Sequence, residues 1–182
     1  MSNFNELIFS NFKKAKSEQL KNHSTTVNIW SSKNYNSNSF KFANLDDLIN
    51  FRSYKIRLFR GDNSFGNKKA ICMFFVEILQ ELGFEFVVNN LNKKNVGNCE
   101  NSYKIQGYFF DKDLLIQIYN FNDLVKFVFS KKKIKTVFEI GGGFGQLAKI
   151  ILNKYDCKFF SIDLPEANLL TSYYLHESLP EK

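Results

Sequence analysis

The feature that most constrains the fold of this chain is a glycine-rich turn between an apolar β-prone run and an apolar helical pattern. Residues 136–140 read as a strand, residues 141–145 are mostly glycine, and residues 146–152 repeat apolar side chains at helical spacing. A second apolar run, residues 157–162, follows and ends in an aspartate. Glycine allows positive φ angles and close approach of a ligand to the backbone. The pattern therefore predicts a β–α–β unit with a ligand-binding turn.

Two ligands fit this unit. The spacing Gly-x-Gly-x-x-Ala over residues 143–148 is compatible with a dinucleotide such as NAD, whose pyrophosphate lies on the turn. Glu139 argues against NAD, because a carboxylate at the end of the strand would repel a pyrophosphate. S-adenosylmethionine carries an ammonium and a sulfonium and no phosphate. Glu139 followed by the glycines therefore favours S-adenosylmethionine, and Asp163 is placed to accept hydrogen bonds from ribose hydroxyls.

The same residues resemble a known family. Residues 138–145 (FEIGGGFG), 161–166 (SIDLPE) and 169–175 (LLTSYYL) are similar to the sugar O-methyltransferases, which are class I, Rossmann-like, S-adenosylmethionine-dependent enzymes often found with bacterial surface-polysaccharide genes. The similarity covers about residues 136–176. The glycine loop is shared by all class I methyltransferases, whereas the two later segments are more specific. Upstream, the chain is similar to the family only at scattered positions: Trp30, Phe51-Arg52 with Gly61-Asp62, and Val96-Gly97-Asn98.

The expected cofactor site combines the glycine turn with the two acidic residues. Glu139 is expected beside the methionine ammonium, or as a carboxylate that only orders the loop. Asp163 is expected at the ribose hydroxyls and Leu164 beside the adenine. The predicted cofactor-binding residues are Glu139, Gly141, Gly142, Gly143, Gly145, Asp163 and Leu164.

The predicted fold class is α/β with two regions. Residues 1–130 are expected to form a mainly helical region with a small hairpin, and residues 131–182 the first part of a Rossmann-like domain with two parallel strands and flanking helices. The family's later strands, which carry the acceptor site and the general base, have no counterpart in the sequence. The chain therefore resembles a truncated gene product, a fragment or one part of a split enzyme, and its catalytic residues are unknown.

Periodicity and turn residues predict the elements of the N-terminal region. Apolar spacing and capping residues indicate helices, and β-prone runs separated by an asparagine-rich segment indicate a hairpin or a strand pair. The predicted helices are 3–21, 44–51, 68–82, one beginning at Asp111 or Asp113 and another capped by Asn122; the predicted strands are 84–88 and 103–110. Arg52, Arg57 and Arg60 with Asp62 form either a polar group that faces the acceptor or a solvated charged loop.

Composition excludes several classes of function. The net charge is +7, but the basic residues are scattered rather than interleaved with aromatic residues, so nucleic acid is not an expected partner. No apolar run approaches the roughly 20 residues of a transmembrane helix, and a cytoplasmic location is expected. Cys72, Cys99 and Cys157 lack the spacing of a disulfide framework or zinc site. Cys72 and Cys157 are predicted to be core thiols, and no metal site is expected.

Three functions remain open from sequence alone. The leading hypothesis is a methyltransferase that transfers a methyl group from S-adenosylmethionine to a sugar or polysaccharide precursor, with the catalytic domain incomplete in this chain. An NAD-binding oxidoreductase fragment is the enzymatic alternative. The third hypothesis is a non-catalytic truncated relative that acts through a partner. A subunit that supplies the missing strands is a possible partner under either the first or the third hypothesis.

Overall fold

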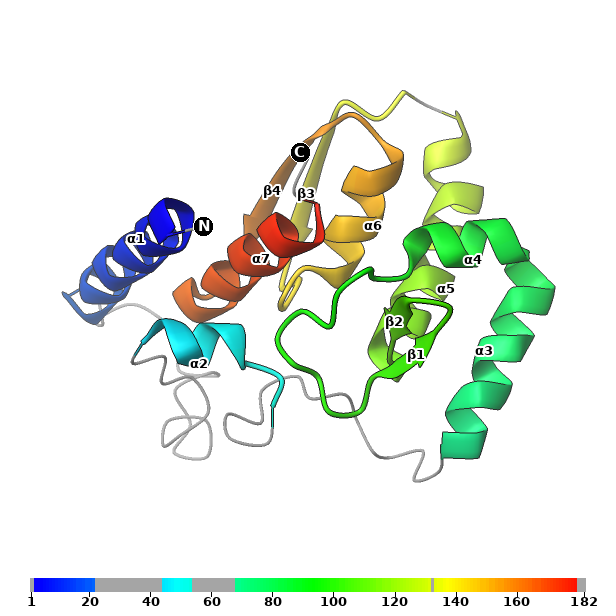
Figure 1. Ribbon diagram of the computed structural model, residues 1–182. Helices are drawn as coiled ribbons and strands as arrows, with labels where there is room; N and C mark the ends of the chain where they lie inside the picture. The colour runs from blue at the N-terminus through cyan, green and yellow to red at the C-terminus, as the bar shows by residue number, and fades with distance from the viewer. Residues whose placement is uncertain (1, 22–43, 54–67, 132, 180–182) are drawn as a thin grey trace.

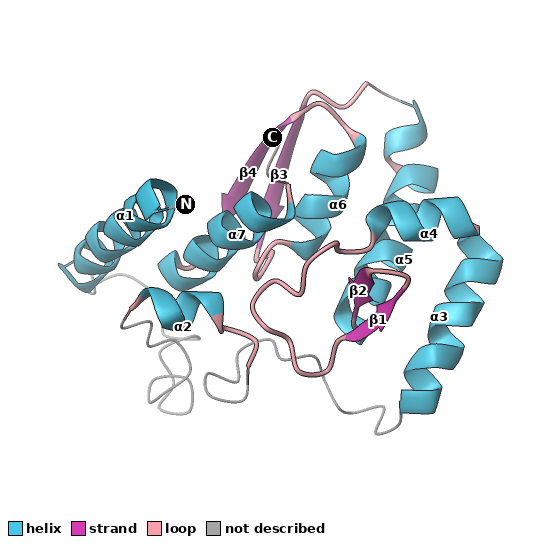
Figure 2. Cartoon of the chain, in the orientation of Figure 1, coloured by secondary structure: helices cyan, strands magenta, loops and turns pink. Residues whose placement is uncertain are grey.

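The protein is described by a computed structural model that covers residues 2–21, 44–53, 68–131 and 133–179 (Figure 1). The predicted α/β class is confirmed, since the described residues contain helices and two small sheets, one antiparallel and one parallel (Figure 2). The elements are α1 (Ser2–Lys21), α2 (Leu45–Ile49), α3 (Lys68–Leu82), α4 (Phe84–Asn90), β1 (Tyr103–Ile105), β2 (Tyr108–Phe110), α5 (Lys112–Phe127), the short 3₁₀ helix η2 (Phe129–Lys131), β3 (Thr136–Ile140), α6 (Gln146–Lys154), β4 (Lys158–Ile162) and α7 (Pro165–Ser178).

The predicted β–α–β unit is present. β3 and β4 are parallel, with Thr136 opposite Lys158 and Ile140 opposite Ile162, and α6 connects them. The Gly141 N–H extends the pairing by donating to the Ile162 carbonyl at 3.0 Å. The described residues contain only these two parallel strands, so the Rossmann-like assignment of the unit stays a prediction.

Two predictions for the N-terminal region are wrong. Residues 84–88 form helix α4 rather than a strand, because Val87 and Asn90 lie three apart and both turn inward, while Phe86 stacks on Phe121 of α5. Tertiary packing therefore overrides the β propensity of this run. The hairpin forms within residues 103–110 instead, where Gln106 and Gly107 have φ angles of 48° and 88° that suit a tight turn.

The second error concerns residues 111–128, which form one helix and not two. Asp111 caps α5, since its Oδ1 accepts a hydrogen bond from the Leu114 N–H at 3.1 Å. Asn122, predicted to cap a separate helix, lies inside α5. Asn122 does not cap a separate helix because the apolar face of α5 continues past it, from Leu114 and Phe121 to the partly buried Val125.

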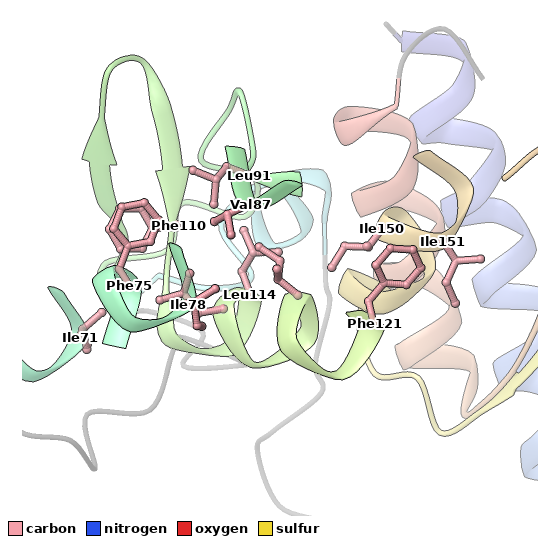
Figure 3. Close-up of a cluster of buried hydrophobic side chains, with 12 residues drawn as sticks. Ile71, Phe75, Ile78, Val87, Leu91, Phe110, Leu114, Phe121, Ile150 and Ile151 are labelled. Carbon is pink, nitrogen blue, oxygen red and sulfur yellow. The ribbon is translucent and has the colours of Figure 1, made fainter. Parts of the chain in front are cut away.

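Helix α5 is the centre of the larger hydrophobic core (Figure 3). Its buried face packs against α3, α4 and β2 on one side and against Ile150 and Ile151 of α6 on the other. Four side chains of α5 are buried at 0 % exposure and recur at helical spacing: Leu114, Leu115, Ile118 and Phe121. The core thus contains side chains from both the N-terminal helices and the β–α–β unit. Residues on the two sides of the predicted boundary near residue 130 share it.

A second core cluster joins α2 to α7. Leu48 and Phe51 pack with Phe144 of the glycine turn and with Tyr173 and Tyr174 of α7. The Phe51 and Phe144 rings meet edge to face with centroids 5.4 Å apart. The residues that follow α2 therefore support the glycine turn directly.

Arg52 is buried in this second cluster, with 1 % of its surface exposed. Its Nη1 lies 2.9 Å from Asp111 Oδ2, and its Nη2 lies 3.8 Å from Asp113 Oδ2. The guanidinium also lies over the Phe144 ring, 4.8 Å from the centroid. The solvated-loop interpretation is therefore wrong for Arg52. The residues predicted to cluster with it, Arg57, Arg60 and Asp62, lie outside the described residues.

Helix α1 packs along α7 (Figure 1). The Phe4 ring stacks on His176 with centroids 3.8 Å apart, and Lys16 forms an ion pair with Glu166. These contacts attach the N-terminal helix to the side of α7 that faces away from α6. None of the helices in the described part of the chain is both long and apolar enough to cross a membrane.

The β3–β4 sheet has one covered face and one open face. Val137 and Phe159 pack against the larger core, whereas Phe138, Ile140, Phe160 and Ile162 are 65 %, 82 %, 47 % and 53 % exposed. Phe138 and Phe160 stack across the strands with centroids 4.9 Å apart. Within the described residues, no third strand pairs with the sheet.

The cysteines are only partly where the sequence predicts them. Cys157 packs against the larger core, as expected, but Cys72 is exposed on α3 and its prediction as a core thiol is wrong. Ile71, Phe75 and Ile78 form the buried stripe of α3, so position 72 turns outward. Cys99 is buried, and burial raises the pKa of its thiol to about 12.

Arg52→Met is expected to lower the free energy of unfolding by about 3–5 kcal/mol, because Asp111 then keeps a buried charge without its partner. Urea unfolding followed by circular dichroism measures the change. Lys94→Met is the matched control, since the Lys94 side chain is 55 % exposed in its ion pair with Glu177 and its loss costs about 1 kcal/mol or less. Equal losses in the two variants would contradict the role given to Arg52.

The thiols are expected to differ in reactivity toward Ellman's reagent at pH 8. Cys72 is exposed and reacts first, while Cys99 stays protonated and unreactive until the protein unfolds. Cys72→Ser removes the fast phase, and Cys99→Ser leaves it unchanged. A fast phase that disappears in Cys99→Ser would contradict the placement of these residues.

Candidate cofactor-binding site

The glycine turn has a backbone that requires glycine at several positions. Gly141, Gly143 and Gly145 have φ angles of 72°, 65° and 90°, in the left-handed region that other residues rarely adopt. Gly145 then forms the N-cap of α6. The predicted turn between the end of β3 and the start of α6 is thus confirmed, with its peptide planes turned by these three positive φ angles.

The N–H and the carbonyl of Gly143, which belong to two successive peptide groups, are both held by side chains from later elements of the chain. The Gly143 N–H donates to Asp163 Oδ2 at 3.1 Å, and the Gly143 carbonyl accepts from Thr171 Oγ1 of α7 at 2.9 Å. Thr171 also packs on Gly145, where a Cβ would lie only 2.9 Å from its Cγ2. The end of β4 and the first half of α7 therefore fix the shape of the turn.

Asp163 has a structural task in this arrangement. Besides the bond from Gly143, its Oδ1 accepts from the Leu164 N–H at 2.7 Å. A carboxylate offers about four lone-pair sites, so capacity remains for the ribose hydroxyls. The ribose contact of Asp163 stays a prediction, as does the adenine contact of Leu164, which is half-buried at the start of α7.

Glu139 lies on the covered side of β3 and folds against the glycine turn. A Cβ built on Gly142 would lie 2.2 Å from Glu139 Oε2, so the carboxylate occupies the space that a side chain at position 142 would need. Oε2 is buried and has no hydrogen-bond partner. Burial, and secondarily the charge of Asp163, raises the pKa of the Glu139 carboxyl above its ordinary value. The structure therefore holds an acceptor here without a donor.

A pocket of about 580 Å³ opens at this point. Its walls come from the end of β3, the glycine turn, the start of α6 and the N-terminal half of α5. The lining residues are Asp113, Ile116, Gln117, Glu139, Gly141, Gly142, Gly143, Phe144, Gln146 and Leu147. Four of the residues singled out from the sequence, Glu139, Gly141, Gly142 and Gly143, thus line one pocket, whereas Gly145, Asp163 and Leu164 lie outside the lining.

Sequence reasoning missed the wall formed by α5. Asp113 and Gln117 are four residues apart, so they share one face of the helix, but no local signal places that face beside a turn far along the chain. Gln146 was also missed, although it follows the last glycine of the motif directly and its position could have been noted.

The polar side chains that line the pocket are two carboxylates and two amides: Asp113, Glu139, Gln117 and Gln146. A third carboxylate, that of Asp163, lies outside the lining and accepts a hydrogen bond from the Gly143 N–H. In the described ranges, no group of three or more His, Cys, Asp or Glu side chains is arranged to hold a metal ion.

Comparisons of the chain with protein-family models, with curated proteins and with solved structures found no match. The preference for a ligand therefore rests on geometry and charge.

Glu139→Gln is expected to leave the free energy of unfolding at pH 7 unchanged or higher. With its pKa raised in the folded state, Glu139 binds more protons when folded than when unfolded, so its contribution to stability falls as the pH rises from the unfolded pKa through the folded one. The neutral amide lacks this penalty. The advantage of the variant should increase as the pH rises above the ordinary pKa of glutamate, and urea unfolding at a series of pH values measures it.

Asp163→Asn is the matched control for this experiment. The Asp163 carboxylate accepts hydrogen bonds from the backbone N–H groups of Gly143 and Leu164, and an amide is a weaker acceptor. The substitution is therefore expected to lower the free energy of unfolding by about 1–3 kcal/mol at pH 7. A loss in Glu139→Gln as large as that in Asp163→Asn would mean that the Glu139 carboxylate is an essential support of the turn.

Proposed function

We propose that this chain binds S-adenosylmethionine at the glycine turn, as the cofactor-binding part of a class I, Rossmann-like methyltransferase. The observation that carries the proposal is the Glu139 carboxylate, whose Oε2 is buried without a hydrogen-bond donor at the wall of the pocket. Leaving a buried acceptor unpaired is costly, and a ligand with an ammonium group removes that cost. The methionine ammonium of S-adenosylmethionine supplies such a donor.

Charge favours this ligand over a dinucleotide. A pyrophosphate on the turn would lie close to Glu139 and to Asp163, and like charges in a partly desolvated site repel each other strongly. The N-terminus of α6 by itself suits either ligand, because its N–H groups attract phosphate and carboxylate alike. The acidic residues around the turn therefore decide the preference for a ligand that carries positive charge.

The residues present fit the roles that the cofactor requires. Glu139 binds the ammonium, the Gly141 to Gly143 backbone gives close approach, and the spare lone pairs of Asp163 accept from the ribose. When bound, S-adenosylmethionine supplies an electrophilic methyl group. The protein contributes by holding the methyl carbon and the acceptor oxygen in line at short distance.

The nature of the acceptor rests on the sequence resemblance. Residues 161–166 and 169–175 resemble the sugar O-methyltransferases, and we propose on that basis a hydroxyl of a sugar or polysaccharide precursor as the acceptor. A sugar hydroxyl needs a positioned general base. We propose that the base and the acceptor site come from further polypeptide, in the same chain or a partner subunit, that extends the β3–β4 sheet.

The NAD-binding alternative is supported by one observation, the Gly-x-Gly-x-x-Ala spacing with an aspartate at the end of β4. A non-catalytic role through a partner is supported by the open apolar face of the sheet, where Phe138, Ile140, Phe160 and Ile162 are exposed. Neither alternative gives the Glu139 carboxylate a ligand.

Calorimetric titration with S-adenosylmethionine tests the proposal. The wild-type chain is expected to bind one equivalent, and Glu139→Gln is expected to bind at least about tenfold more weakly, because a charge-assisted hydrogen bond is lost. Glu77→Gln, at an exposed position of α3, is the matched control and keeps wild-type affinity. Unchanged or tighter binding by Glu139→Gln, or no binding by the folded wild-type chain, would contradict the proposal.

A further inference from the structure

We infer that Gln146 is a specificity-determining residue that recognises the carboxylate at the amino-acid end of the ligand. The inference rests on the proposed function and names a contact outside the glycine motif. Gln146 is 5 % exposed and lines the pocket, and its Nε2 is buried without a hydrogen-bond partner. Its amide group is therefore an unpaired donor at the wall of the same pocket in which Glu139 is an unpaired acceptor.

The start of α6 adds a second attraction for a negative group. Gln146 is the first residue of the helix, Gly145 at the N-cap has no side chain to accept from the first-turn N–H groups, and the first turn contains no acidic residue. The partial positive charge at this helix end is thus not offset by the helix's own side chains. A ligand carboxylate near Gln146 would meet both the amide donor and these N–H groups.

The neighbouring charges are compatible with a carboxylate at this position. Asp113 is the acidic residue that lines the pocket from α5, and it lies 3.8 Å from the Arg52 guanidinium, which offsets its charge. Glu139 lies against Gly142, and its unpaired oxygen suits the ammonium of the same ligand. The pocket thus has an unpaired acceptor on Glu139 and an unpaired donor on Gln146. These two groups complement the ammonium and the carboxylate of an α-amino acid zwitterion.

This arrangement distinguishes ligands by their amino-acid end. S-Adenosylhomocysteine has both an ammonium and a carboxylate, whereas 5′-methylthioadenosine has the same nucleoside and thioether without them. The pocket is therefore expected to bind S-adenosylhomocysteine more tightly than 5′-methylthioadenosine, and Gln146 is expected to account for part of that difference.

Calorimetric titration of the wild-type chain, Gln146→Met and Gln146→Glu with both ligands tests the inference. Methionine keeps the length of the side chain without the donor, and glutamate places a negative charge against the ligand carboxylate. Gln146→Met is expected to lose about tenfold in affinity for S-adenosylhomocysteine, Gln146→Glu more than that, and both to bind 5′-methylthioadenosine as the wild type does. Unchanged 5′-methylthioadenosine binding also shows that the variants are folded.

Two results would overturn the inference alone. One is wild-type affinity of Gln146→Met for S-adenosylhomocysteine, and the other is an equal loss of affinity for both ligands. Binding of neither ligand by the folded wild-type chain would instead overturn the proposed function, and the inference with it. The wild-type titration thus separates failure of the site from failure of the role given to Gln146.

Discussion

The site depends on two hydrogen bonds that hold the backbone of Gly143, one at its N–H and one at its carbonyl. Asp163 at the end of β4 accepts from its N–H, and Thr171 of α7 donates to its carbonyl. The glycines of the turn have no side chains to pack, and Phe144 is the turn residue that enters a core cluster. The two hydrogen bonds hold the part of the turn that has no side chain. The turn therefore takes its shape from elements that come after it in the chain.

A fixed turn explains the unusual state of Glu139. With Gly142 held in place, the carboxylate folds into the space left by the missing Cβ, where it is partly removed from water and close to Asp163. Such a placement raises the energy of the ligand-free protein and has no evident benefit for stability. Groups that are destabilised in this way are typical of binding sites, because the interaction with the ligand offsets the destabilisation.

The N-terminal region supports the same turn from the other side. Arg52 joins the segment after α2 to the cap of α5 through Asp111 and lies over the ring of Phe144 within the turn. Its backbone N–H also donates to Gly97 at 2.8 Å. Both core clusters contain residues from each side of the predicted boundary near residue 130. The helical region and the β–α–β unit thus share cores, and α5 supplies one wall of the pocket.

The sequence predicted the local parts of this structure and missed the contacts between distant segments. The β–α–β unit follows from glycine spacing and apolar periodicity within about 30 residues, so its strands, turn and helix were predictable. The Arg52–Asp111 pair joins residues 59 positions apart, and no local pattern identifies it. The same limit explains α4, where packing of Phe86 on Phe121 outweighs β propensity, and the place of α5 beside the turn.

The pocket is proposed to select a ligand with an α-ammonium group over a ligand with a pyrophosphate. Titration of the folded wild-type chain with S-adenosylhomocysteine and with NAD⁺, under identical conditions in a calorimeter, tests it most directly. We expect saturable binding of S-adenosylhomocysteine at one equivalent and no detectable binding of NAD⁺. Binding of NAD⁺ without binding of S-adenosylhomocysteine would contradict this selectivity and would favour the dinucleotide interpretation of the glycine turn.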